Sequence, residues 1–477
     1  NYTIEGNSDI KKAAGLIISN HGAISGIDII DSFINNIDKA IAAGFVLRNE
    51  KDGLIENCHI NNVGTKDSKF QSGFVYENYG KITNSNTILP AMESGFVNIN
   101  QGVIEGCSST GNVNDIFMID YVGGFAKINY GIIKGSSSKG DVSGDMLVVF
   151  ASHLGGFVGY NSGTIKESNS IGNVSVGYAS GFAVKNDGDI IDCTAKGNAF
   201  NGIACGFVEN NNSTITNCTA TGSAFGGIAS GFVQNNNGTI TNCKATGTAD
   251  SEHSNAGGFV SINKGIIECC SSTGNVNDMS ADYEVGFVGG FVGYNSGTIR
   301  ESSSTGNVFS KRKDAGGFVG KNEKGKITNC TATGEAKGNN AGGFVGYNSG
   351  IIEESSSTGA ASGQNYAGGF VGKNEGDTIT NCTAKGIANS NKNAGGFVGE
   401  NSGIIKESIS TGAVKGNTAG GFVGVNKAEI KGCKAEGKAT AKTESEIALA
   451  GGFVGENENG TITDCEATGG ADSRSSL

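Results

Sequence analysis

The sequence has no tryptophan, a single proline and only four histidines among its 477 residues. Without proline and without a strict Gly-X-Y period, its 80 glycines do not indicate a collagen triple helix. No apolar stretch approaches the length of a membrane-spanning helix, and no signal peptide is present. We therefore expect no membrane span in this chain, and its start at Asn1 suggests a processed form or an excised fragment.

Clustered positive charge and the common catalytic motifs are also missing. The formal net charge is -11, whereas phosphate binding needs concentrated lysine and arginine, so we expect no nucleic-acid partner. The basic run 311–313 stands beside Asp314 and is interpreted as a solvated loop. There is no H-E-x-x-H, no G-x-S-x-G at a strand-to-helix turn, no phosphate loop and no calcium loop. We predict no catalytic residue, no metal site and no cofactor, and hence no enzyme.

Abundant glycine together with asparagine, serine, threonine and β-branched residues favours short strands joined by turns. At 37% apolar residues the chain can build a core and is not expected to be disordered. The composition therefore predicts an all-β protein.

A repeat runs through the chain, and its anchor is a Gly-Phe pair such as Gly156-Phe157. The first copy has Leu16 in place of phenylalanine, and the last has Phe453. The average period is roughly 27 residues, which is within the range of solenoid repeats. The anchor phenylalanines are Phe45, Phe74, Phe96, Phe125, Phe157, Phe182, Phe207, Phe232, Phe259, Phe291, Phe318, Phe344, Phe370, Phe397, Phe422 and Phe453.

Three further columns keep register with the anchor. An asparagine stands four positions after the anchor in all 17 copies, and an isoleucine usually stands eight positions after it, as Ile165 and Ile299 do. Three residues beyond the isoleucine is a cysteine or serine in 16 of 17 copies, with Ile27 as the exception. Within a unit apolar and polar residues alternate: phenylalanine inward, valine outward, then isoleucine and cysteine or serine inward. This alternation is typical of short strands with one buried face.

Units too short to fold alone must stack, so the columns predict a right-handed parallel β-helix of about 17 turns. We expect one domain over 1–477, with less regular turns in 1–100, regular turns in 101–470 and a tail in 471–477. We expect the asparagine column at a buried corner of each turn and the phenylalanine and cysteine columns in the core. The predicted ladder residues are Asn161, Asn186, Asn211, Asn236, Asn263, Asn295, Asn322, Asn348, Phe157, Phe182, Phe207, Phe232, Cys193, Cys218, Cys243 and Cys270.

Ten of the 12 cysteines occupy the cysteine or serine column, and Cys205 and Cys269 lie outside it. A metal ladder or a disulfide spine is one interpretation of this column. Their spacing is the repeat period, however, and no C-x-x-C occurs. We therefore favour free thiols that fill a narrow core in place of serine.

Segments such as 316–322 and 342–352, with the letters GGFVGKN and GGFVGYNSGII, resemble the GLUG repeat. This family occurs in large bacterial and archaeal surface adhesins and beside the catalytic part of some immunoglobulin A-cleaving peptidases. The resemblance covers about residues 13 to 470, with phenylalanine where the family name has leucine. It implies a right-handed β-helix on an extracellular surface and identifies no ligand.

The three longest intervals between anchors end at Phe157, Phe291 and Phe453. The apolar segments 116–121 and 145–150 form either an exposed patch for a partner or an extra strand layer over the helix. The candidate partner-binding residues are Phe117, Met118, Tyr121, Met146, Leu147, Phe150, Met279 and Tyr283.

These features favour a non-catalytic stalk or adhesive module of a large cell-surface protein, located outside the cell, with a host protein or glycan as receptor. The alternatives are an accessory region of a secreted peptidase, a carbohydrate-active β-helix enzyme, and a subunit of an end-to-end stacked fibre. Neither end has an evident cap, so we expect flanking domains of the same polypeptide or self-association.

Overall fold

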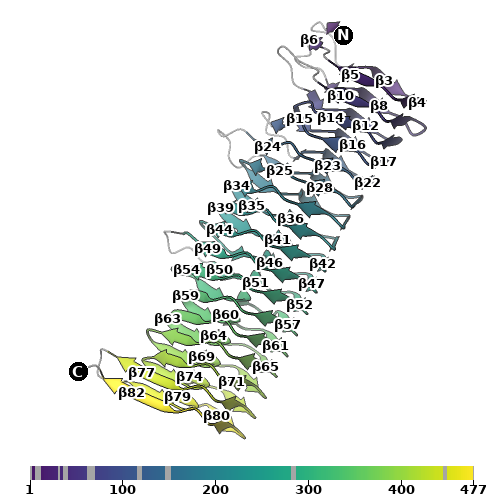
Figure 1. Cartoon of the computed structure of the whole chain (residues 1–477). Coiled ribbons are helices and arrows are strands. Elements are labelled where there is room, and N and C mark those ends of the chain that lie inside the picture. Colours follow the sequence, from purple (N-terminus) through teal and green to yellow (C-terminus); the bar gives the residue numbers. More distant parts are fainter. Residues whose placement is uncertain are drawn as a thin grey trace. The chain divides into compact units, whose positions relative to one another are not determined.

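The computed structural model describes residues 3–5, 12–30, 33–35, 41–61, 70–114, 121–144, 152–280, 286–443 and 448–475. These residues form short strands and turns without any helix, so the described chain holds no helix able to cross a bilayer. They divide into two units, Asn1–Gly226 and Gly227–Leu477. In each unit the strands stack in parallel as successive rungs (Figure 1). The predicted parallel β-helix is confirmed, and the single domain over 1–477 stays a prediction.

One turn of unit 1 shows how the chain is folded. It consists of β26 (Val158–Asn161), β27 (Thr164–Lys166), β28 (Asn169–Ser170), β29 (Val174–Ser175) and β30 (Tyr178–Ser180). The next turn repeats these strands, and each pairs in register with its equivalent, as Asn161 does with Asn186. Because equivalent residues lie above one another, every column of the sequence becomes a row along the stack.

Unit 2 has the same turn, but in two of its described turns the return is one continuous strand. One example is β60 (Val345–Asn348), β61 (Ile351–Glu353), β62 (Ser356–Ser357) and the eight-residue β63 (Ala361–Gly368). Among the described residues, eight strands that end at the column asparagine lie in unit 1 and nine in unit 2. In unit 1 they are β3 (Ile17–Asn20), β8 (Val46–Asn49), β12 (Val75–Asn78), β16 (Val97–Asn100), β21 (Ala126–Asn129), β26, β31 (Ala183–Asn186) and β36 (Val208–Asn211). In unit 2 they are β41 (Val233–Asn236), β46 (Val260–Asn263), β51 (Val292–Asn295), β56 (Val319–Asn322), β60, β64 (Val371–Asn374), β69 (Val398–Asn401), β74 (Val423–Asn426) and β79 (Val454–Asn457).

The anchor phenylalanines form the widest part of the core. Neighbouring rings within a unit stack with centroids 4.6–5.0 Å apart, which is the spacing of adjacent strands. The valine after each anchor was expected to point outward, and this was wrong: Val158 and Val345 are fully buried. The chain bends at the anchor, where Phe182 O accepts both Phe157 N–H and Val158 N–H. The bend interrupts the strict alternation of a flat strand.

A second corner separates the isoleucine strand from the cysteine or serine strand. In every turn the residue at this corner has a positive φ, between 47° and 66°. Glycine adopts this conformation freely and asparagine tolerates it, whereas other side chains rarely do. The column consists of Gly26, Asn57, Asn84, Gly106, Gly135, Glu167, Asp192, Asn217, Asn242, Cys269, Glu301, Asn329, Glu354, Asn381, Glu407, Gly432 and Asp464.

Two parts of the chain depart from the regular turn. Near the N-terminus, β11 (Phe70–Ser72) and β15 (Ala91–Ser94) pair with a shift of register, in the stretch expected to be irregular. At the other end, a tail was expected from residue 471. Residues 471–475 instead form β82 (Ala471–Ser475), which pairs with β77 (Ala439–Thr443). The pairing follows because the column that holds Ala439 continues at Ala471.

Candidate functional site

The asparagine ladder is buried and its amides are hydrogen-bonded. In unit 1, Asn161 Nδ2 donates to Gly163 O at 3.3 Å and to Asn186 Oδ1 at 2.8 Å. Asn186 in turn donates to Asn211 Oδ1 at 2.9 Å. In unit 2 the same bond of 2.8–2.9 Å links Asn236, Asn263, Asn295, Asn322 and Asn348 in sequence. Each amide therefore bonds its own turn and the next, which satisfies polar groups that are 0% exposed.

The predicted phenylalanine and cysteine residues also meet their neighbours within each unit. Phe157 stacks on Phe182 and Phe182 on Phe207, while Phe232 stacks on Phe259 in unit 2. In the cysteine column, Cys193 N–H points at Cys218 Sγ at 3.4 Å, and Cys243 N–H at Cys270 Sγ at 3.3 Å. Both columns therefore form continuous rows where the sequence predicted them.

These cysteines are free and almost fully buried. Their thiols donate to backbone carbonyls, as Cys193 Sγ does to Ile191 O at 3.1 Å. Burial raises the pKa of Cys330 and of Cys382 to about 12. A thiol with such a pKa is almost entirely protonated near neutral pH and is a poor nucleophile.

The candidate partner-binding residues have different positions. Phe117, Met118, Met146, Leu147, Phe150 and Tyr283 lie outside the described residues. Tyr121, in unit 1, packs against the rings of His153 and Tyr160, with centroids 5.9 and 5.8 Å away. Met279, in unit 2, is 67% exposed. The structure therefore places two of the eight candidates, Tyr121 in an aromatic cluster and Met279 on an exposed surface.

A buried ion pair lies next to Met279. Lys313 Nζ is 3.1 Å from Asp278 Oδ1, and the two side chains are 2% and 0% exposed. The basic run 311–313 was interpreted as a solvated loop, which is wrong for Lys313. Its ammonium group also donates to His253 O at 2.8 Å and to Ser254 O at 3.1 Å, so all three donors have partners.

Both carboxylate oxygens of Asp278 also have hydrogen-bond donors. Asp278 Oδ1 accepts from the Ser280 hydroxyl at 2.7 Å, and Asp278 Oδ2 from the Ser310 hydroxyl at 2.7 Å. A buried charge pair is tolerated where such hydrogen bonds replace water. The network ties three successive irregular returns of unit 2 together and fixes the position of Ser310.

Beyond Ser310, a groove of about 810 Å³ runs along the outer surface of unit 2. It follows β54 (Val308–Ser310), β59 (Ala336–Gly342), β63, β67 (Ala388–Ser390) and β72 (Val414–Gly416), which pair in this order. We call this surface the basic groove. One outward side chain from each rung lines it, namely Phe309, Lys337, Ser362, Asn389 and Lys415.

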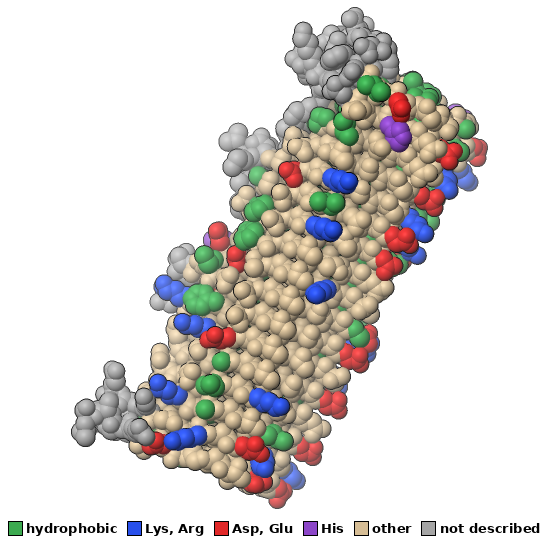
Figure 2. Space-filling view, in the orientation of Figure 1, with side chains coloured by type: hydrophobic (Ala, Val, Ile, Leu, Met, Phe, Trp, Pro, Cys, Tyr) green, Lys and Arg blue, Asp and Glu red, His purple; other side chains and the backbone are tan. Residues whose placement is uncertain are grey.

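Lysine dominates the charge of the basic groove. Lys311, Lys337 and Lys415 line it, and no lining residue is acidic. Within the described ranges none of these lysines forms an ion pair, although Lys337 Nζ lies 5.6 Å from the ring centroid of Phe309. Figure 2 shows basic side chains on both sides of an exposed apolar one in the region that β54 and β59 occupy in Figure 1. The groove therefore offers uncompensated positive charge on an acidic chain.

A second row of side chains lies where β50 (Phe287–Gly289) meets the strands that end in asparagine. Lys321 Nζ is 5.1–5.8 Å from the ring centroids of Phe287, Tyr294 and Tyr347. Tyr294 donates to Glu323, and burial together with this acceptor raises the pKa of Tyr294 to about 12. These cations, rings and carboxylates pair with one another, so the row stabilises the corner and leaves no free charge for a ligand.

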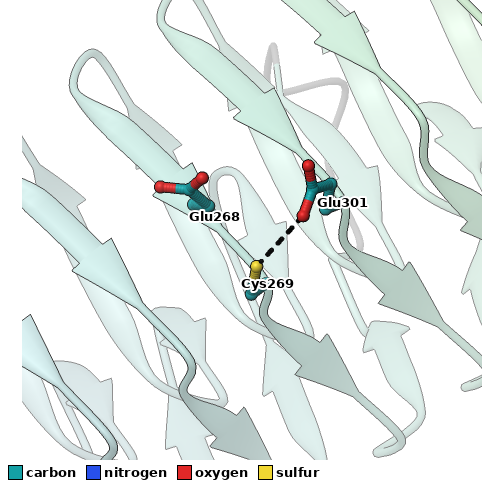
Figure 3. A group of neighbouring side chains, drawn as sticks. All are labelled: Glu268, Cys269 and Glu301. Carbon is teal, nitrogen blue, oxygen red and sulfur yellow. Dashed lines mark hydrogen bonds between the residues drawn. The ribbon is translucent and has the colours of Figure 1, made fainter.

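One group of side chains in unit 2 has the composition of a metal site. The possible ligand atoms of Glu268, Cys269 and Glu301 lie within 4.8 Å of one another (Figure 3). Cys269 occupies the left-handed corner of its turn and Glu301 the same corner of the next turn. The Cys269 thiol donates to Glu301 Oε2 at 3.4 Å, and this bond raises the pKa of the thiol.

The neighbouring arginine decides how this group behaves. Arg300 Nη2 lies 2.8 Å from Glu268 Oε2, so one of the two carboxylates is already neutralised. The Cys269 thiol is exposed, and its raised pKa favours the protonated form. A protonated thiol is a weaker metal ligand than a thiolate. We assign no metal to this group.

Comparison with known families identifies the repeat. The family model of the GLUG motif matches residues 288–308, 313–336, 363–389 and 448–472. All four segments lie in unit 2, and segment 363–389 contributes Gln364 and Asn389 to the basic groove. No curated protein and no solved structure matches the chain. With four copies of the motif in stacked turns of parallel strands, the chain is a GLUG-repeat protein.

Proposed function

We propose that this chain is a non-catalytic structural module of a cell-surface protein, which presents a binding surface outside the cell and contributes to attachment. Its GLUG repeats and stacked parallel strands make it a repeat structural module. The extracellular location and the role in attachment are the proposed parts.

The observation that carries the proposal is the continuity of the ladders within each unit. In unit 2 the asparagine bonds run without a break from Asn236 to Asn457, and the phenylalanine stack runs from Phe232 to Phe453. Each turn contacts mainly its neighbours, as in other solenoids, so outward residues can vary without disturbing the core. A rigid support with a variable outer surface suits the presentation of a binding site.

The location is tested by labelling producing cells with antibodies raised against the recombinant chain. We expect intact cells to be labelled, with a cytosolic protein of the same cells as the control that stays unlabelled until permeabilisation. Labelling that requires permeabilisation would contradict the surface location. Attachment is tested separately, by measuring whether beads coated with the chain are retained on layers of host cells.

A further inference from the structure

The basic groove has a repeat along its length that matches a linear polymer. Its five rungs, from Phe309 to Lys415, are successive strands about 4.8 Å apart and so extend over roughly 19 Å. Each rung presents at least one outward side chain to the groove. An extended chain of similar units lying along this row can contact one or more side chains with each unit.

The charges of the groove select an anionic ligand of moderate charge density. Lys311, Lys337 and Lys415 are distributed along the row. Among the described residues, none of these three lysines forms an ion pair with a carboxylate. An ammonium group that meets a ligand carboxylate forms a charge-assisted hydrogen bond, stronger than one between neutral groups. The net charge of -11 opposes a densely charged polyanion, so one carboxylate per sugar or per disaccharide fits better than the two phosphate rows of a nucleic-acid duplex.

The remaining side chains suit a hydroxylated ligand. Amides of Gln364 and Asn389 and the hydroxyl group of Ser362 stand between the lysines. Gln364 Nε2 donates to Lys311 O at 2.8 Å, which fixes its side chain across the groove. Phe309 is 41% exposed and supplies an apolar face on which a ring can pack. A peptide is less suited, because β59 is paired on both sides and leaves no free edge for an added strand.

From this geometry we propose that the basic groove binds a linear acidic glycan, a polysaccharide segment whose sugars carry carboxylates. The proposal rests on the proposed function and names the ligand class of its binding surface. Lys337 and Lys415 contact carboxylates, Phe309 packs against a sugar ring, and the amides bond hydroxyl groups.

The test measures binding of the full chain to linear uronate oligosaccharides by titration calorimetry. The probes are tetramers of galacturonate, of mannuronate and of the hyaluronan repeat, each compared with its carboxyl-reduced, neutral counterpart. We expect at least one acidic tetramer to bind, with an affinity that falls as salt is added. The affinity of its reduced form should be lower by about tenfold or more. The tetramer should be recovered intact. If no acidic tetramer binds better than its reduced form, the proposal is overturned.

Substitutions locate the site. The double variant Lys337→Gln, Lys415→Gln should weaken binding of the acidic tetramer by about tenfold or more, because two charge-assisted contacts are lost. The matched control Lys385→Gln, Lys431→Gln removes two exposed lysines of unit 2 that lie outside the groove and should leave the affinity unchanged. Phe309→Ala should weaken the acidic and the reduced forms by a similar factor, because ring packing needs no charge.

Two results would overturn the glycan assignment even if an anion binds. One is an equal loss of affinity in the control double variant, which would indicate a general charge effect. The other is tighter binding of single-stranded oligonucleotide or polyglutamate than of every uronate tetramer. Failure of cell labelling with successful glycan binding would reject the surface location alone, so the two proposals can fail separately.

Discussion

The inward and the outward residues of unit 2 follow opposite rules, although they alternate along the same strands. Inward from the basic groove, the column consists only of small apolar residues that are 0–3% exposed, namely Val308, Ala336, Ala361, Ala388 and Val414. The next residue of each strand points outward, and these residues differ in size, polarity and charge: Phe309, Lys337, Ser362, Asn389 and Lys415. The inward column has to fit the turns above and below, whereas the outward residue meets solvent.

The difference shows where selection for function can act in a solenoid. An outward substitution leaves the stack intact, so a ligand site can be assembled from single residues of successive turns. Phenylalanine, lysine, asparagine and cysteine are among the residue types that occur in both positions within unit 2, and each allows the same side chain to be compared in the two environments.

The largest expected effect concerns phenylalanine. Phe344 is fully buried between Phe318 and Phe370, with ring centroids 4.9 and 4.7 Å away. Phe344→Ala should lower the free energy of unfolding by about 3–5 kcal/mol, because it leaves a cavity in the stack. Phe309→Ala, on the outer surface, should cost less than about 1 kcal/mol. Urea unfolding and hydrogen exchange of the neighbouring strands measure both, and similar losses would show that the two positions do not differ as described.

Lysine gives the next effect. Lys313→Met leaves Asp278 as a buried charge without its cation and should lower the free energy of unfolding by about 3 kcal/mol. This is the lower end of the range for such pairs, because two serine hydroxyls still donate hydrogen bonds to the carboxylate. Lys337→Met should change stability by less than about 0.5 kcal/mol. The double variant Lys313→Met, Asp278→Leu should recover part of the loss in urea unfolding. A double variant less stable than Lys313→Met would contradict the role of the uncompensated charge.

Asparagine follows. Asn295→Ala removes the acceptor of Asn263 Nδ2 and the donor to Asn322 Oδ1, and it should cost about 1–3 kcal/mol because buried polar groups lose their partners. The exposed Asn389→Ala should cost less than about 0.5 kcal/mol. Faster amide hydrogen exchange confined to the turns around Asn295 is the expected signature. Unchanged exchange there would mean that the ladder bonds contribute nothing to stability.

The smallest expected effect is on the rate at which two adjacent cysteines are alkylated, and it involves no change in stability. Cys269 is exposed and Cys270 is 2% exposed, so iodoacetamide should modify Cys269 first in the folded chain at pH 8. The carboxylate of Glu301 raises the pKa of the Cys269 thiol, so Glu301→Gln should lower this pKa and speed the modification. Mass spectrometry of the digested chain follows both sites. A slower reaction in Glu301→Gln, or earlier modification of Cys270, would contradict this arrangement.

The fold could be predicted from the sequence because the inward residues recur in register. The phenylalanine, asparagine, isoleucine and cysteine or serine columns each correspond to a row in the structure. The left-handed corner was missed, although a column rich in glycine, asparagine and acidic residues just before the cysteine or serine carries the signal. Glutamate is rare in this conformation, which concealed the column in turns such as those of Glu167 and Glu301.

The basic groove could not be predicted in the same way. Its residues come from five turns and change in type from one turn to the next, so no column contains them. Only the pairing of strands brings Phe309 beside Lys337. The buried ion pair was equally hidden, because Asp278 and Lys313 belong to different irregular returns. A basic run in a sequence gives no sign that one of its lysines is buried by contacts from other turns.

The asparagine ladder has a direction. From Asn236 to Asn457 each amide donates its hydrogen to the asparagine of the following turn, so the side-chain dipoles of unit 2 all align along the stack. Such aligned bonds polarise and strengthen one another. A duplicated copy of one whole repeat, inserted at a turn, would find an acceptor on one side and a donor on the other. A gene encoding this chain can therefore lengthen or shorten by whole turns while the polarity of the column is preserved.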